Sequence, residues 1–195
     1  MNSFIKFGGI DMADKEIKKN EDLSEYEGFT VGLALVDALP VIFFSCSLIC
    51  IATALAGTGV TFWVVLIGAI AIALAGLCKV LWKLFLGLKV GNIKILNKIF
   101  VPFMASGFMV ALVGAIIGTF TKAIKWGGVL KAVVSIPALI FFILGFCGMG
   151  VMSYVKKTNK RDEFNKDAKK NWIAQCVNGF SQGMLFLGIL FATKG

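Results

Sequence analysis

Five long apolar stretches divide the 195-residue chain, and they restrict its fold more than any other feature of the sequence. They cover about residues 29–56, 60–82, 99–120, 132–155 and 171–193. A helix needs roughly 20 apolar residues to cross the ~30 Å hydrocarbon layer of a bilayer, and each stretch has about that length. Inside lipid a helix also satisfies its own backbone hydrogen bonds. The sequence therefore predicts an all-α integral membrane protein, a bundle of about five transmembrane helices.

The polar segments complete this outline. Residues 1–28 hold seven acids and four lysines, and we expect them to form a retained, cytoplasmic N-terminal segment because they lack the order of a secretory signal. Residues 29–195 then form one transmembrane helical domain. Between the second and third stretches, lysines alternate with apolar residues, which is typical of a cationic helix at the headgroup level. We expect these lysines to contact anionic lipid headgroups; they are Lys79, Lys83, Lys89, Lys94 and Lys98.

The distribution of positive charge predicts the orientation. Sixteen of the twenty Lys and Arg residues fall in the N-terminal segment and in the connections after the second and fourth stretches. Cytoplasmic loops carry the excess of basic residues, so we expect the N-terminus inside, the C-terminus outside and the chain in the plasma (cell) membrane. The four tryptophans lie near predicted span ends, where an aromatic belt forms; they are Trp63, Trp82, Trp126 and Trp172.

Asp37 is the only acidic residue inside the apolar stretches. An ionisable group in the membrane costs free energy, so it either serves a function or is sheltered by a partner. Pro40 has no N–H, which leaves the carbonyl of Val36 without its helical partner and available to a ligand. These features favour a cation or proton site. The alternative is that Asp37 lies nearer the cytoplasmic interface and pairs with a lysine such as Lys79 or Lys83.

A polar stripe runs along the last apolar stretch. Gln175, Asn178 and Gln182 recur at helical spacings of three and four, and Ser181 lies beside them. Such side chains must face protein or water rather than lipid. They either line a cavity that binds a substrate or ions, or form hydrogen bonds across a helix interface. The GxxxG pair at 179–183 favours the close approach of another helix.

Several kinds of site are missing from the sequence. The chain has no histidine, which excludes Ser-His-Asp and Cys-His catalytic sites and a histidine-ligated haem. It has no phosphate-binding loop or dinucleotide fingerprint. Its five cysteines lie in apolar stretches, where cysteine behaves as a small hydrophobe. Lysine outnumbers arginine nineteen to one, whereas base recognition relies on arginine. We therefore expect no enzyme, no metal or other cofactor and no nucleic-acid partner.

Two functions stay open. The first is a transport or channel-type protein or subunit, with Asp37 and the polar stripe on facing helices. Five spans are few for a monomeric transporter, so this function requires a homo-oligomer or a partner membrane subunit. The second is a non-catalytic lipid-binding protein, or an accessory or scaffold subunit of a membrane complex. An acid and a polar stripe together exceed what packing requires, which favours transport.

Overall fold

The structure, a computed structural model, describes residues 23–55, 57–158 and 167–194. This part of the chain contains six helices and no strand. The helices are α2 (Val31–Ala54), α3 (Val60–Gly87), α4 (Lys94–Phe120), α5 (Trp126–Val133), α6 (Ile136–Thr158) and α8 (Ala168–Lys194). Most of the predicted N-terminal segment (1–22) and the centre of the last polar connection (159–166) lie outside the described residues.

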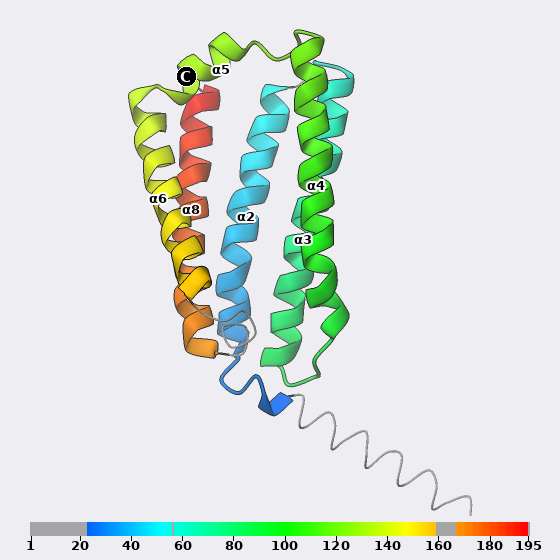
Figure 1. Cartoon of the computed structure of the whole chain (residues 1–195), viewed down its shortest axis with the longest axis vertical. Helices are drawn as coiled ribbons and strands as arrows, with labels where there is room; N and C mark the ends of the chain where they lie inside the picture. Colours follow the sequence, from blue (N-terminus) through cyan, green and yellow to red (C-terminus); the bar gives the residue numbers. More distant parts are fainter. Residues whose placement is uncertain (1–22, 56, 159–166, 195) are drawn as a thin grey trace, which may run out of the picture.

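Five of these helices are long and apolar enough to cross a membrane, as the sequence predicts. They are α2, α3, α4, α6 and α8, and their most apolar windows have mean hydropathies between 1.4 and 2.6. They run side by side along the long axis of the molecule, while the short α5 lies across one end (Figure 1). This all-helical bundle indicates a membrane-embedded protein.

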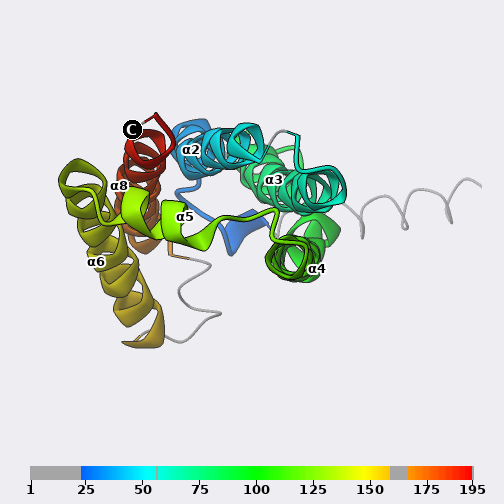
Figure 2. The same ribbon diagram turned by 90° about the horizontal axis from the view of Figure 1, so that it is seen from above.

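The five long helices form a curved row with α2 at its centre. Helix α2 packs on α3 and on α8, α3 packs in turn on α4, and α8 packs on α6. Seen from above, α4 and α6 stand at the two ends of this row, and α5 and its linker pass from one end to the other (Figure 2). The row thus has a concave side, and all five long helices border it (Figure 2).

Glycines allow the close packing of α3 against α4. A Cβ atom added to Gly68 would lie 2.6 Å from the backbone of both Gly107 and Ala111. A Cβ atom on Gly107 would lie 2.6 Å from the side chain of Ile72. Small residues at the interface of membrane helices let the backbones approach each other, so van der Waals contact can hold the pair together. Helices α3 and α4 therefore form one closely packed wall.

The cationic helix predicted between the second and third spans is not a separate element. Residues 79–87 continue α3, and α4 begins at Lys94 after a short turn at 88–93. Helix α3 extends past the predicted span end at residue 82, and Lys83, just beyond that end, is buried and paired with Asp37. A neutralised charge does not need to leave the bundle, so the lysines do not mark the end of this span.

Trp82 also lies inside the bundle and not in a lipid-facing belt. Only 3% of it is exposed, and its ring lies edge-on to Tyr26, with 5.7 Å between the ring centroids. Its Nε1 donates a 2.9 Å hydrogen bond to Oδ1 of Asn92 in the turn after α3. Together with Phe29, these side chains close one end of the α2–α3 interface.

The fourth span begins later than the sequence predicts. Ala132 and Val133 belong to α5, and α6 begins at Ile136. The hydroxyl of Ser135 donates to the carbonyl of Ala132 across the turn between the two helices (2.7 Å). Pro137 then occupies the first turn of α6, where the missing N–H of proline costs no helical hydrogen bond.

Candidate functional site

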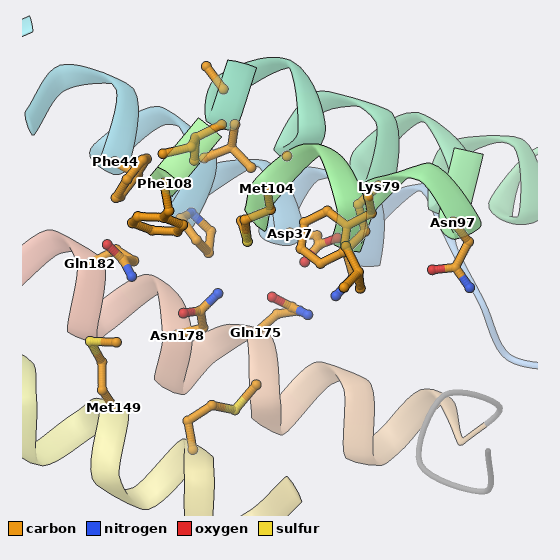
Figure 3. A pocket seen from close by; sticks show the side chains of 18 of the residues that line it. Asp37, Phe44, Lys79, Asn97, Met104, Phe108, Met149, Gln175, Asn178 and Gln182 are labelled. Carbon is orange, nitrogen blue, oxygen red and sulfur yellow. The ribbon is translucent and has the colours of Figure 1, made fainter. Parts of the chain in front are cut away.

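A cavity of about 950 Å³ lies on the concave side of the row, and residues of all five long helices line it. Small-molecule sites in proteins typically measure about 300–1,000 Å³, so this volume is sufficient for a ligand of substantial size. Figure 3 shows side chains from α2, α4, α6 and α8 converging on it. The cavity contains most of the residues that the sequence marks as candidates, and several that it does not.

Helix α8 supplies the polar wall of the cavity. Gln175, Asn178 and Gln182 all line it, and Figure 3 shows them projecting from α8 toward the side that carries Asp37 and Phe108. Gln175 is only 4% exposed, and its Oε1 has no hydrogen-bond partner among the described residues. A buried polar atom without a partner costs free energy. Contact between Gln175 and a ligand stays a prediction.

Ser181 lies on a different face of α8 from the other three candidates. It is fully buried, and its hydroxyl donates to the carbonyl of Val177 within the helix (2.7 Å). A Cβ atom added to Gly148 of α6 would meet the Ser181 side chain. The structure therefore places Ser181 at the α6–α8 interface and outside the cavity.

The GxxxG pair of α8 faces α2. A Cβ atom on Gly183 would lie 3.4 Å from the ring of Phe43, and one on Gly179 would lie 3.9 Å from Leu39 and Pro40. One face of α8 thus serves helix packing, and the adjacent face lines the cavity. Binding of a substrate or ions by the amides on the cavity face stays a prediction.

Asp37 lies on α2, on the side of the cavity opposite Gln175 (Figure 3). It is 5% exposed, and its Oδ2 lies 3.2 Å from Nζ of Lys83, which is 1% exposed. This ion pair is one of the two alternatives that the sequence leaves open for Asp37. A lone charge at this depth would be costly, and the pairing offsets part of that cost. Contact between Asp37 and a ligand stays a prediction.

Lys79 and Lys98 bring positive charge to the same end of the cavity. Nζ of Lys79 lies 4.6 Å from the ring centroid of Phe100 on α4, a cation–π contact. No carboxylate among the described residues lies within ion-pair distance of Lys79 or Lys98. Because Lys83 balances Asp37, the two other lysines leave this end of the cavity positive, which the sequence does not predict.

The structure separates the five lysines that we expected at the headgroups. Lys89, Lys94 and Lys98 are exposed at one end of the bundle, and headgroup contact by them stays a prediction. Contact with lipid headgroups requires a lysine at the surface, whereas Lys83 is buried against Asp37. Lys79 is half-buried and faces the cavity.

Helices α4 and α6 supply an apolar wall. Val101 and Phe108 of α4 and Met149 of α6 line the cavity although 40–51% of each residue is exposed. Lining residues that are also exposed mark the mouth of a cavity, so the mouth lies between α4 and α6. Methionine and phenylalanine in an apolar stretch resemble lipid-facing residues, and so the sequence gives no signal for this wall.

Two further polar residues of the cavity, Asn97 and Asn171, are also absent from the candidates that the sequence marks. Each falls near the start of a long helix, in α4 and α8. Asparagine near a helix start usually belongs to a solvated helix end, so the sequence does not indicate that these two residues line a cavity. Asn171 is nevertheless 4% exposed. The one sequence signal for Asn171 is thus its position within a turn of the start of an apolar stretch.

No protein family, curated protein or solved structure matches the chain. The described residues contain no group of three or more His, Cys, Asp or Glu side chains with the geometry of a metal site, and all five cysteines are free. The groups that the cavity offers to a ligand are lysine ammonium groups, amides and one paired carboxylate.

Proposed function

We propose that this chain is a transport or channel-type membrane protein, or a subunit of one, and that the cavity is its substrate site. One observation carries the proposal: a single cavity joins Asp37 on α2 to Gln175, Asn178 and Gln182 on α8. Ionisable and amide side chains inside a membrane span typically face protein or a water-filled path. The Oε1 atom of Gln175 is buried without a hydrogen-bond partner, and helix packing alone does not require a polar side chain there.

The depth of the cavity supports a substrate path. Asn171 and Gln182 both line it, and eleven residues of helix at 1.5 Å per residue correspond to about 16 Å. This is roughly half of the ~30 Å hydrocarbon layer. The cavity thus reaches from one end of the bundle to about its middle. We propose that the N-terminus lies on the cytoplasmic side of the cell membrane. In that orientation this end of the cavity faces the cytoplasm.

The proposed protein works as a homo-oligomer or with a partner membrane subunit. Helix α4 is the least covered of the five spans, with 11% of its apolar window buried, which supports a further chain in the assembly. The proposal includes no catalytic step and no nucleic-acid partner.

A second candidate function is that of a non-catalytic lipid-binding or accessory subunit. The exposed lysines at one end of the bundle, Lys89, Lys94 and Lys98, favour it. Basic residues near a membrane surface attract anionic headgroups by about 1 kcal/mol each. In this case the amides of α8 would serve packing against a partner, and the cavity would be closed to water.

The accessibility of Gln182 to water tests the proposal. Gln182→Cys, in a full-length chain without its five native cysteines, is expected to react with a membrane-impermeant thiol reagent in membrane vesicles. Phe180→Cys is the matched control on the same helix, because Phe180 is 52% exposed on the outside of the bundle and is expected to face lipid. If Gln182→Cys stays unreactive from both sides in a folded chain, the accessory function is favoured instead.

A further inference from the structure

We propose that the cavity binds an anionic amphiphile, a molecule with a phosphate or carboxylate headgroup and an apolar tail. This inference rests on the proposed function and names the class of its substrate. Two observations carry it: the charged end of the cavity is positive, and the opposite wall is apolar and opens sideways between α4 and α6.

The headgroup end is built for an anion. Asp37 is matched by Lys83 at 3.2 Å, so the charges of Lys79 and Lys98 are left for a ligand. The ring of Phe100 holds the Lys79 ammonium group against the wall at 4.6 Å. An aromatic face attracts the cation but is not a conventional acceptor, so the three N–H donors of the ammonium group stay available. A cation bound here would instead meet two lysines of its own sign.

The tail end is lined mostly by apolar, adaptable side chains, with the Gln182 amide beside them (Figure 3). Met104 and Phe108 of α4, Phe44 of α2 and Met149 of α6 line it. Methionine side chains are flexible and fill irregular gaps, which suits an acyl chain of variable shape. From Lys98 to Phe108 the cavity follows α4 for about 15 Å at 1.5 Å per residue. A ligand of this length would place its charge at the lysines and its tail among these side chains.

The position of the mouth agrees with a ligand that comes from the bilayer. Val101, Phe108 and Met149 are 49%, 51% and 40% exposed and lie at the edge of the cavity. This mouth faces the side of the bundle, between two membrane-spanning helices, where lipid tails surround the protein. An amphiphile can enter there without leaving the hydrocarbon layer, with its tail at these apolar side chains and its headgroup at the exposed Lys98.

Gln175 adds a requirement on the headgroup. Its Oε1 is a hydrogen-bond acceptor that is buried and has no partner in the described part of the chain. A ligand that carries a donor next to its negative charge, such as a hydroxyl group, would satisfy this atom. Phosphatidylglycerol has a phosphate beside two hydroxyl groups and is therefore a suitable probe.

Photolabelling in lipid nanodiscs tests the inference on the full-length protein. Nanodiscs of phosphatidylcholine would contain a trace of phosphatidylglycerol with a photoreactive acyl chain, or of phosphatidylcholine with the same chain. We expect the anionic probe to label Met104 and Asn178 several-fold more than the zwitterionic probe. Labelling of the outward-facing Phe180 is expected to be equal for both probes and reports contact with the surrounding lipid. Monodisperse gel filtration of each variant reports whether it is still folded.

The lysine variants locate the headgroup. Lys79→Gln and Lys98→Gln are each expected to lower cavity labelling by the anionic probe roughly tenfold, the size of one hydrogen bond to a charged group. Lys89→Gln removes an exposed charge at the same end of the bundle but outside the cavity, and it should leave the labelling unchanged. Equal labelling by the two probes, or equal effects of the three variants, would overturn the inference.

Other occupants give different results. If millimolar inorganic phosphate abolishes labelling by the anionic probe, the site binds a free anion and the role of the tail is wrong. If the cavity is not labelled and cysteines placed at Val101 and Met149 form disulfides between copies, a second chain fills the mouth, which also overturns the inference. If Gln182→Cys reacts with the thiol reagent while labelling fails, only the ligand class is wrong. If both fail, the proposed function fails as well.

Discussion

Lys79 and Lys83 lie one helical turn apart on α3, and the bundle places their charges in opposite surroundings. Lys83 is 1% exposed, and its Nζ lies 3.2 Å from the Asp37 carboxylate. Lys79 is half-buried, contacts the Phe100 ring and lines the cavity, and no carboxylate among the described residues lies within ion-pair distance of it.

This difference separates a charge that is neutralised inside the protein from one that is not. An ion pair buried between α2 and α3 contributes to the specificity of their packing, and removing one partner leaves a costly lone charge. A lysine at the edge of a cavity needs no intramolecular partner and can bind an anion. Both roles arise from the same residue type at successive turns of one helix. The position of Asp37 on α2 decides which of the two lysines is paired.

The largest expected effect is on stability. Lys83→Met leaves the buried Asp37 unpaired and is expected to lower the free energy of unfolding by about 3–5 kcal/mol. Lys79→Met loses mainly the contact with Phe100, for a cost of about 1 kcal/mol or less. Denaturant-induced unfolding of the two variants in the same detergent measures the difference. Equal losses would show that the two lysines do not differ in this way.

The next effect is the coupling between the two partners. Asp37→Leu combined with Lys83→Met removes both charges, and apolar replacements of buried ion pairs are often tolerated. We therefore expect the double variant to be more stable than the sum of the single variants predicts, by about 2–3 kcal/mol. The same cycle with Lys79→Met in place of Lys83→Met should give a much smaller coupling energy. A coupling near zero in the first cycle would contradict the ion pair.

A smaller effect is expected where α3 closes against the start of α2. A Cβ atom on Gly87 would lie 2.6 Å from the carbonyl carbon of Thr30 and 2.7 Å from the nitrogen of Val31. Because these are backbone atoms, Gly87→Ala is expected to destabilise the protein by about 1–3 kcal/mol. Gly150→Ala is the control, since its Cβ would meet nothing within 4 Å and should be neutral or slightly stabilising. Thermal unfolding of both variants measures the difference, and a neutral Gly87→Ala would show that this end of the bundle is loose.

The sequence predicts the number and approximate limits of the spans because apolar length is a local property. It also predicts that Gln175, Asn178 and Gln182 share one face of a helix, since their spacing follows the helical repeat. The ends of the spans are less certain. Helix α3 continues to Gly87 and a partner distant in the sequence neutralises Lys83, and spacing along one helix cannot reveal that partner.

The cavity itself is the part that the sequence predicts least. Phe108 and Met149 look like ordinary lipid-facing residues until two helices that pack on different neighbours bring them to one mouth. Lys79 has the same spacing among apolar residues as the lysines at the surface. It nevertheless lines the cavity, where it contacts Phe100 of α4. Contacts between spans that are distant in the sequence create these roles.

A cysteine scan along α8 tests the central claim most directly. Single cysteines at Gln175, Asn178 and Gln182, and at the outward-facing Ile173 and Phe180, would be placed in a full-length chain without native cysteines. The rate of reaction with a membrane-impermeant thiol reagent would be measured at each position in membranes. The account predicts fast reaction at Asn178 and Gln182, slower reaction at the more buried Gln175, and the slowest reaction at the two outward positions. Uniformly slow reaction along the helix would show that the polar face of α8 is packed against protein, and would contradict a substrate site between α2, α4 and α8.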